Sequence, residues 1–377
     1  MSTVPWQSFL ALSRNCETDE VRVLVAMSGG VDSSVAAALC VEAWGTEDVV
    51  GATLKLWGGA SDSGCCSVAD VDDARRVADQ LGIVHHVFNF ADDFERHVVE
   101  PYVAGHAEGR TPNPCIECNR HLKFDRLLER ARALGFDAVA TGHHARCERD
   151  DDGSWRLRRG ADTKKDQSYV LAMLGQEQLA QTLLPLGGMI KDDVRAEAAR
   201  LGLRTAAKPD SQDVCFIRSD TGRAGFLGDR ITLHPGRMVD ADTGADLGPV
   251  EAVELVTIGQ RRGMGHSTDG RRRFVTAVDL PSRRVTVGPP EAAYAPGLTL
   301  STIAWVAGPP PVGPTGAFPA LAQCSAHGPA LPAVVQVGDE HLDVTFATPQ
   351  RRVAPGQTVA LYDPDHPDDV VGSGVVT

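Results

Sequence analysis

Three cysteines at two places in the sequence have the residue type and setting for sulfur chemistry. Cys115 and Cys118 lie in the stretch TPNPCIECN, and Cys215 lies in KPDSQDVCFI. A thiolate is both a nucleophile and a metal ligand, so these residues suit group transfer or metal binding. The prolines and asparagines around the first pair predict a rigid loop. A helix that begins near Asn119 would favour the thiolate of Cys118 through its positive end.

Two structural explanations compete with a chemical role for these cysteines. The spacing of Cys115 and Cys118 is that of half a zinc site, but structural zinc needs four ligands and the sequence offers no second pair at zinc-finger spacing. Cys215 taken alone fits a buried residue, because cysteine is among the most buried residue types. Chemistry is therefore favoured for the first pair, and both explanations stay open for Cys215.

The stretch AMSGGVDSS predicts a phosphate-binding turn between a strand and a helix. A glycine-rich turn in this position exposes backbone N–H groups and the positive end of a helix to an anion. No Gly-Lys-Ser or Gly-Lys-Thr follows, which disfavours a nucleotide site of the Walker type. A turn that only connects two elements, without a ligand, is the structural alternative. The candidate residues are Ala26, Met27, Ser28, Gly29, Gly30, Val31, Asp32 and Ser33.

Alternating elements must position this turn. Apolar, β-branched runs predict strands at 21–27, 49–57, 83–90 and 136–145, and helical spacing of apolar residues predicts helices at 32–44, 68–82 and 124–135. This alternation predicts an α/β fold, an open and mostly parallel doubly wound sheet with helices on both faces. Ligands then bind at the carboxyl ends of the strands.

The texture of the sequence changes near Gly225. Short alternating strands separated by Gly, Pro and Asp turns predict an all-β part. We expect a catalytic domain at 1–225, a small β-rich middle domain at 226–290 and a C-terminal β-barrel at 291–377. Between Leu255 and Pro290 the sequence contains seven arginines and only two acidic residues. This basic patch is either a solvated surface or a contact for phosphates.

Composition places the chain among folded proteins. Hydrophobic residues make up 42% and charged residues 23% of its 377 residues, and its net charge is −13. It has no apolar run long enough for a membrane span and no secretory pattern at its start, so we expect a cytoplasmic protein. The nine cysteines, including the adjacent Cys65 and Cys66, form no regular framework and fit a reducing compartment.

These motifs together resemble a known family. SGGVDSS is similar to the loop of pyrophosphate-loop ATP-dependent adenylating enzymes. Together with seven further motifs in the same order, it resembles the tRNA-specific 2-thiouridylases through almost the whole chain. The further motifs are SGCCSVADVDDARRVADQLGI, GRTPNPCIECNRHLKF, ATGHHAR, KDQSYVL, PDSQDVCFI, TIGQRRGMG and PGQTVALYD. The resemblance implies a pyrophosphate-loop fold and ATP with Mg²⁺.

The resemblance also implies a reaction and its residues. ATP would adenylate the C2 oxygen of the wobble uridine of tRNA, and sulfur would replace it, giving AMP and pyrophosphate. Cys215 would carry the persulfide, and Cys118 would release the sulfur by forming a Cys118–Cys215 disulfide, which must then be reduced. Leu54 and Gly142 would border the adenine and ribose.

The resemblance implies RNA contacts and partners as well. The residues implied to contact the target base or the anticodon arm are Asn113, Pro114, Cys115, His143, Lys165, Asp166, Gln167 and Gln357. The expected partners are tRNAs for Lys, Glu and Gln and a cysteine desulfurase or sulfur carrier, with the protein a monomer. His85, His86 and His144 are interpreted as structural or surface residues.

Two departures from the family pattern open alternatives. Cys115 stands where many members have an aspartate, so it either takes over proton transfer or joins Cys118 and Cys215 as a ligand of a [4Fe–4S] cluster that delivers sulfide. The barrel reads LAQCSAHG where the family often has arginines, so its RNA contacts are less defined. Other classes considered are an amidotransferase-type synthetase with the same loop and a non-enzymatic RNA-binding module.

Overall fold

The computed structural model describes residues 21–57, 67–210, 214–218, 220–266 and 270–377. Cys16, Cys65 and Cys66 therefore lie outside the described residues. The chain begins with a parallel sheet in the order β3-β2-β1-β4-β7. Its strands are β1 (Val23–Ala26), β2 (Val49–Lys55), β3 (Val84–Asn89), β4 (Ala138–Ala140) and β7 (Thr182–Leu183).

Helices cover both faces of this sheet because its central strand is apolar on both sides. In β1, Val23 and Val25 belong to one buried cluster with α2 (Val31–Trp44), α3 (Val68–Leu81) and α9 (Lys191–Arg200). Leu24 belongs to a second cluster with α5 (Glu100–Ala107) and α7 (Leu127–Ala133). Apolar residues on both faces of a strand are typical of a parallel sheet. The predicted doubly covered sheet is confirmed.

Shorter elements connect these layers. A two-stranded hairpin, β5 (Ala145–Arg149) and β6 (Trp155–Arg159), follows β4. The short helical segments are α4 (Ala91–Phe94), η1 (Glu95–Val99), α6 (Pro114–Glu117), η2 (Cys118–Arg126), η3 (Ser168–Leu171), α8 (Gln176–Leu179) and α10 (Gly222–Gly228). No helix of the described ranges is both long and apolar enough to cross a membrane.

The middle part of the chain is a four-stranded sheet in the order β10-β11-β8-β9. Its core is made by apolar residues of β10 and β11 together with Val253 of η4. The elements are β8 (Gly236–Asp240), β9 (Asp246–Val250), η4 (Val253–Leu255), β10 (Phe274–Asp279), β11 (Arg284–Gly288) and η5 (Pro290–Ala293).

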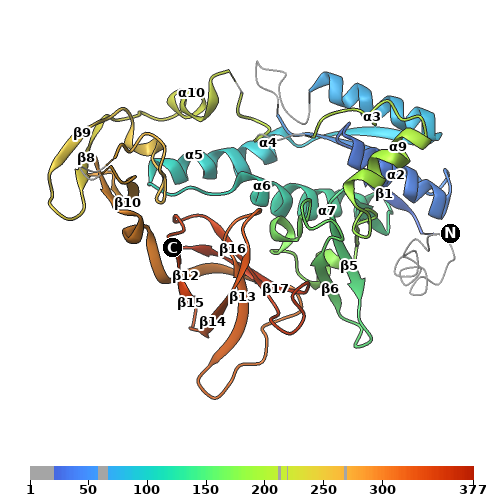
Figure 1. The fold of residues 1–377 in the computed structure, drawn as a ribbon. Coiled ribbons are helices and arrows are strands. Elements are labelled where there is room, and N and C mark those ends of the chain that lie inside the picture. The colour runs from blue at the N-terminus through green and yellow to red at the C-terminus, as the bar shows by residue number, and fades with distance from the viewer. Residues whose placement is uncertain (1–20, 58–66, 211–213, 219, 267–269) are drawn as a thin grey trace.

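The C-terminal part is a closed barrel in the order β12-β15-β14-β13-β16-β17. Figure 1 shows this barrel beneath α5 and α6, with the middle sheet beside it. Alternate residues of its strands fill a separate apolar core. The strands are β12 (Tyr294–Trp305), β13 (Ala317–Gln323), β14 (Ala330–Val337), β15 (Leu342–Arg351), β16 (Thr358–Tyr362) and β17 (Val370–Val376). A middle domain and a C-terminal barrel are thus confirmed as parts of the fold.

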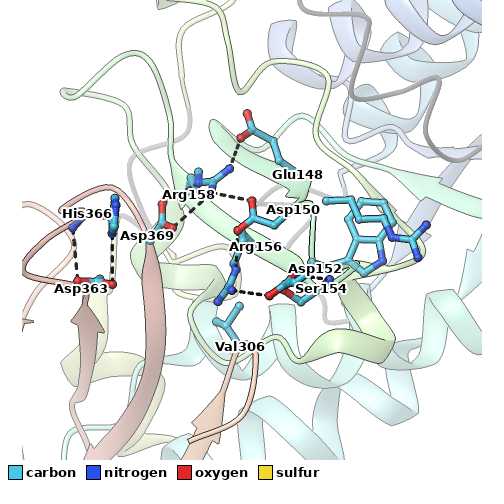
Figure 2. A network of polar contacts seen from close by, with 12 residues as sticks. Glu148, Asp150, Asp152, Ser154, Arg156, Arg158, Val306, Asp363, His366 and Asp369 are labelled. Atoms are coloured by element: carbon cyan, nitrogen blue, oxygen red, sulfur yellow. Dashed lines mark hydrogen bonds and ion pairs between the residues drawn. The ribbon is translucent and has the colours of Figure 1, made fainter. Parts of the chain in front are cut away.

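A network of ion pairs holds the barrel to the β5–β6 hairpin (Figure 2). Arg158 lies between Asp369, at 2.7 Å from its Nε, and Glu148, at 2.6 Å from its Nη1. Its Nη2 lies 2.8 Å from Asp150. One guanidinium thus bridges two carboxylates of the hairpin and one of the barrel, in a geometry that fits its planar set of donors. The hairpin is therefore a docking element for the barrel.

A buried histidine marks the contact between α5 and the middle sheet. His106 is 2% exposed, and its ring packs edge to face on Tyr102 with centroids 4.7 Å apart. Burial lowers the pKa of His106 to about 4, and the positive charge of Arg223 contributes to this decrease. A hydrogen bond with the Glu254 backbone opposes both effects and raises the pKa in part. Glu254 lies in η4, so a neutral imidazole occupies the contact between the two parts.

We expect His106 to make folding sensitive to mild acid. Its pKa is about 4 in the folded chain and about 6.5 in an unfolded chain, so the unfolded state binds more protons between these values. Stability is then complete above pH 6.5 and falls as the pH drops towards 4, by about 2 kcal/mol between pH 7 and pH 5. Urea denaturation at pH 7 and pH 5 measures the free energy of unfolding of wild type and of His106→Gln. The decrease between the two pH values should be smaller in His106→Gln than in wild type by about 2 kcal/mol. Equal losses in the two proteins would contradict it.

Candidate active site

The predicted phosphate loop lies at the carboxyl end of β1 and leads into α2. Gly29 has a φ of 72°, which is in the left-handed region, and Gly30 is the N-cap of α2. The Ser33 hydroxyl accepts from the Ser28 backbone N–H at 3.1 Å and donates to the Gly30 carbonyl at 3.1 Å. These bonds close the turn within the loop. Because Gly30 brings no side-chain acceptor, the first turn of α2 can present its N–H groups to an anion.

Two glycines allow close approaches that shape the loop. A Cβ on Gly29 would lie 2.2 Å from the Asp70 carbonyl oxygen at the start of α3. A Cβ on Gly142, just after β4, would lie 2.7 Å from the Ser33 nitrogen and from the carbonyl carbon of Asp32. The loop is therefore held between α3 and the residues that follow β4. Leu54, the other residue expected near the adenine, is 8% exposed at the end of β2.

Gly142→Ala should damage the loop without removing a functional group. The added methyl must displace backbone atoms of Asp32 or Ser33, and overpacking of this kind costs about 1–3 kcal/mol. We expect weaker ATP binding and a lower midpoint of thermal unfolding. The matched control is Gly313→Ala, in an exposed turn where the nearest atom would be 3.4 Å away. Unchanged ATP affinity in Gly142→Ala would show that the loop tolerates the displacement.

Asp32, in the first turn of α2, is held by two side chains from distant parts of the chain. The Lys191 Nζ lies 2.6 and 2.7 Å from its two carboxylate oxygens, and the His144 Nε2 lies 3.2 Å from Oδ1. Burial opposes ionisation of Asp32, but the hydrogen bonds from His144 and Lys191 outweigh it and lower the pKa of this carboxyl group. Asp32 is therefore an anion at neutral pH.

Asp210, five residues before Cys215 in the sequence, joins this ionic cluster. Its carboxylate lies 2.9 Å from the Lys191 Nζ, 2.7 Å from the Lys165 Nζ and 2.7 Å from the Arg195 Nη2. Burial opposes ionisation of Asp210, yet the bonds from Lys165 and Lys191 lower its pKa to about 2. Lys191 is thus shared between the phosphate loop and the segment that leads to Cys215.

A second lysine of that segment binds the loop directly. The Lys208 Nζ donates to the Gly29 carbonyl at 2.9 Å, to Asp70 at 2.6 Å and to Asp73 at 2.8 Å. Asp70 and Asp73 lie in α3, so this ammonium joins the loop to that helix. Together with Asp210, it ties the chain before Cys215 to the phosphate loop at two points.

The motif KDQSY connects several parts of the molecule through successive side chains. Lys165 binds Asp210, and Gln167 accepts a hydrogen bond from the His144 backbone at 2.8 Å. Asp166 pairs with Arg159 of the hairpin, Ser168 bonds Tyr362 of the barrel, and Tyr169 donates to the Thr358 carbonyl of the barrel. The segment 165–169 is therefore a junction between the phosphate loop, the hairpin, the barrel and the chain before Cys215.

The prediction of a loop around Cys115 and Cys118 is wrong. The helix begins at Pro114, with Asn113 as N-cap and its side chain accepting from the Cys115 backbone N–H at 3.1 Å. Proline suits the first helical position and asparagine suits the N-cap, so these residues start a helix here. The predicted helix start near Asn119 is wrong for the same reason. Cys118 instead begins a π-helical run, a geometry common at functional sites.

Cys118 and the segment of Cys215 meet the same apolar core. Cys118 is 8% exposed in the cluster that includes Phe216, and Cys215 packs against that cluster. The Phe216 ring lies 5.0 Å from Phe226 and 5.5 Å from Tyr102 between centroids. This aromatic contact holds the residue beside Cys215 in place.

The described residues show no set of three side chains around the three cysteines that could hold iron. Cys115 is exposed at the start of the helix, whereas Cys118 is buried one turn later. Among the described residues, no three His, Cys, Asp or Glu side chains form a group that could hold a metal ion. The placement of the cysteines therefore gives no support to the [4Fe–4S] alternative.

Comparison with known proteins shows the family of this chain. Three family models match it, described as the tRNA methyl transferase HUP domain over residues 21–219, the tRNA methyl transferase PRC-barrel domain over 224–289 and the aminomethyltransferase beta-barrel domain over 295–376. A tRNA-specific 2-thiouridylase of Mycobacteroides abscessus is 48% identical over 95% of this chain and 99% of the relative. One of Frankia casuarinae is 47% identical over 94% and 98%. This chain belongs to the tRNA-specific 2-thiouridylase family.

The alignments with the 2-thiouridylase relatives run almost from end to end of both chains, so the similarity includes all three parts of the fold. The family expectation of a pyrophosphate-loop domain followed by two β domains is confirmed. The residue roles implied by the family are a separate matter. They stay predictions, and the structure adds where each residue lies.

Several residues that the 2-thiouridylase resemblance assigns to RNA contacts are bonded within the protein. Asp166, with a side chain 7% exposed, pairs with Arg159. His143 is 8% exposed, and its Nδ1 forms a hydrogen bond with the Thr141 hydroxyl at 2.7 Å. Burial lowers the pKa of His143 well below its usual value, so this ring is neutral. The Gln357 amide donates to Thr111, in the segment just before Asn113.

The arginine-rich patch of the middle part is only partly available to RNA. Arg273 is 8% exposed and pairs with Asp240, so it serves the fold of the middle sheet. Arg271 pairs with Glu291. The other arginines of the patch are exposed: Arg261, Arg262, Arg272, Arg283 and Arg284.

Four residues of this site were missed by sequence reasoning: His144, Lys191, Lys208 and Asp210. His144, interpreted as structural or at the surface, is 3% exposed and bonded to Asp32. Its place just after β4, where ligands bind in such sheets, is the signal that could have found it. No local signal marks Lys191, because it meets Asp32 only through the packing of α9 beside α2.

Proposed function

We propose that this chain replaces the C2 oxygen of uridine at the wobble position of tRNA by sulfur, in a reaction that consumes ATP and gives AMP and pyrophosphate. Family membership across the full chain supports the reaction class. The observation that carries the proposal is the shared Lys191, which links Asp32 of the phosphate loop to Asp210, shortly before Cys215. In this proposal, nucleotide chemistry and sulfur chemistry share one site.

The loop and α2 bind the β- and γ-phosphates in this proposal, and the uridine O2 attacks the α-phosphate. Pyrophosphate leaves, and the O2–AMP bond makes the former carbonyl oxygen a good leaving group. Mg²⁺ commonly binds through one or two carboxylates together with substrate phosphates, and Asp32 fits this role. When bound, Mg²⁺ would neutralise charge on the phosphates. His144 and Lys191 keep the Asp32 carboxylate ionised and oriented.

Cys215 carries the sulfur as a persulfide received from a cysteine desulfurase or a carrier protein. The terminal sulfur attacks C2 and AMP leaves, which forms a bond from C2 through two sulfurs to Cys215. The Cys118 thiolate then attacks the Sγ of Cys215. The electron pair of the broken S–S bond stays on the sulfur at C2, and a Cys118–Cys215 disulfide remains. A thiol reductant returns both cysteines to thiols.

The RNA contacts are proposed on the surface around α6, the helix that begins at Pro114 and continues into η2 at Cys118. Asn113, Pro114 and Cys115 lie at the start of this helix, where Cys115 is exposed, and would contact the extruded base. Lys165, Asp166, Gln167, His143 and Gln357 act mainly by fixing the segments that face the RNA. The exposed arginines of the middle sheet would bind phosphates. We propose tRNAs for Lys, Glu and Gln as substrates, a cytoplasmic location and a monomer.

A thiolation assay on protein purified without oxygen tests this function. Transcripts with uridine at position 34 are incubated with ATP and either a cysteine desulfurase with cysteine or sulfide alone, and the iron content is measured. We expect iron-free protein that makes 2-thiouridine with the desulfurase, and no product from a transcript with cytidine at this position. Bound iron with activity from sulfide alone would replace the persulfide route. Absence of 2-thiouridine with either sulfur source would overturn the function.

A further inference from the structure

The phosphate loop contains no lysine or arginine of its own between Ala26 and Ser34. Other phosphate-binding loops use a lysine as a point charge for the phosphates. A site for the pyrophosphate part of ATP needs positive charge beyond backbone N–H groups, because Asp32 in the same loop is negative. A cationic side chain for this site, in addition to the Mg²⁺ proposed above, must therefore come from another part of the fold.

The structure brings Lys191 to this position by the packing of α9 beside α2. Its Nζ lies 2.6 and 2.7 Å from the Asp32 oxygens, and its backbone N–H donates to Asp162 at 2.9 Å. Both ends of the residue are thus fixed. Because Lys191 is the first residue of a helix of ten, the positive end of α9 lies with that of α2 at the loop.

Lys191 is buried, and its charge is balanced only by carboxylates that belong to the site. It is 7% exposed, and its ammonium contacts Asp32 and Asp210 alone among the ion pairs of the described residues. A buried ammonium needs such anionic partners. Phosphate oxygens supply the same charge, so an incoming triphosphate can share this cation without leaving the ammonium unpaired.

The neighbouring lysines are less suited to the task. Lys208 directs its three protons to the Gly29 carbonyl and to two carboxylates of α3, so it holds the loop in shape. Lys165 reaches Asp210 but not Asp32, which places it one carboxylate further from the loop. Of the lysines in the described part of the chain, Lys191 is the one whose ammonium bonds the loop aspartate itself.

We propose that Lys191 is the phosphate-binding cation of this site, and that it exchanges part of its bonding with Asp32 and Asp210 for the β- and γ-phosphates of ATP. The inference rests on the proposed use of ATP. Because Asp210 shares the same ammonium, occupation of the phosphate site also weakens one bond that anchors the chain before Cys215. The loop aspartate and the sulfur-carrying segment would then respond together to the nucleotide.

Nucleotide binding without tRNA tests this role. Affinities for a non-hydrolysable ATP analogue and for AMP are measured on the full chain as wild type, Lys191→Met and Lys191→Arg. We expect at least about tenfold weaker binding of the analogue to Lys191→Met and unchanged binding of AMP, because only the former carries the β- and γ-phosphates. Lys191→Arg should recover most of the loss. The control for lost charge is Lys164→Met, at an exposed position near the site, with affinity equal to that of wild type.

The result for AMP separates a phosphate contact from a structural role. If Lys191→Met weakens AMP as much as the analogue, Lys191 only maintains the fold of the loop and the proposal is wrong. Wild-type affinity for the analogue in Lys191→Met would also overturn it. These outcomes are independent of thiolation, since a wild type that binds ATP but makes no 2-thiouridine would contradict the proposed function and leave the role of Lys191 intact.

Discussion

Cys215→Ser should make no 2-thiouridine while still releasing pyrophosphate from ATP in the presence of tRNA. A serine hydroxyl cannot carry the persulfide sulfur, so the second half of the reaction has no donor, whereas the phosphate loop is untouched. Product formation should fall to background. The measurement combines the thiouridine content of the tRNA with pyrophosphate release in the same reaction.

The chain offers a matched control for this substitution in Cys324→Ser. Cys324 is a partly buried cysteine next to the barrel, and burial raises the pKa of its thiol to about 11, so it stays protonated and unreactive near pH 7. Its replacement should leave thiolation at the wild-type level. Thiolation that survives in Cys215→Ser would mean that sulfur reaches the uridine without a persulfide on Cys215.

Asp32→Asn should strongly slow the use of ATP and leave the loading of sulfur on Cys215 intact. The amide keeps the size of the side chain but removes the charge that pairs with Lys191 and His144 and that would meet the metal-bound phosphates. Loss of one such electrostatic contact typically costs about 100-fold or more in rate. Pyrophosphate release with tRNA should fall by that factor. Formation of a persulfide on Cys215 by a desulfurase should continue.

A neighbouring aspartate serves as the comparison for Asp32→Asn. Asp193 lies in the first turn of α9 and is exposed, so Asp193→Asn removes the same charge close to the site without touching the loop. We expect wild-type ATP turnover in this protein. If Asp32→Asn also keeps wild-type turnover, Asp32 has no part in the nucleotide reaction and serves only to pair with Lys191.

Local sequence patterns were sufficient for the elements that are long or strongly patterned. The apolar run at Val23–Ala26, the glycine turn and the helix after it form one continuous signal, and the structure follows it closely. β7 has only two residues, Thr182 and Leu183, and pairs through β4, so no local periodicity marks it. The helix at Pro114 was missed although Asn113 and Pro114 are regular helix-start residues.

The candidate site was only half visible in the sequence because it is assembled across the sheet. The loop and the cysteines lie in recognisable motifs, and these motifs were sufficient to predict Asp32 and Cys215 as site residues. The residues that control the charge of Asp32 come from the end of β4 and the start of α9, far along the chain. Such pairs become neighbours only through strand order and helix packing, which residue spacing does not contain.

The junction at 165–169 limits how freely the parts of this molecule can be exchanged. By sequence these residues belong to the nucleotide-binding domain, yet Ser168 and Tyr169 bond to Tyr362 and Thr358 of the barrel. A chimera cut before β12 would therefore separate the barrel from its bonding partners in segment 165–169. A transplanted barrel would keep the bond to Ser168 only if it brought a hydroxyl at the position of Tyr362, or if segment 165–169 were transplanted with it. The three domains are modules in sequence but not in assembly.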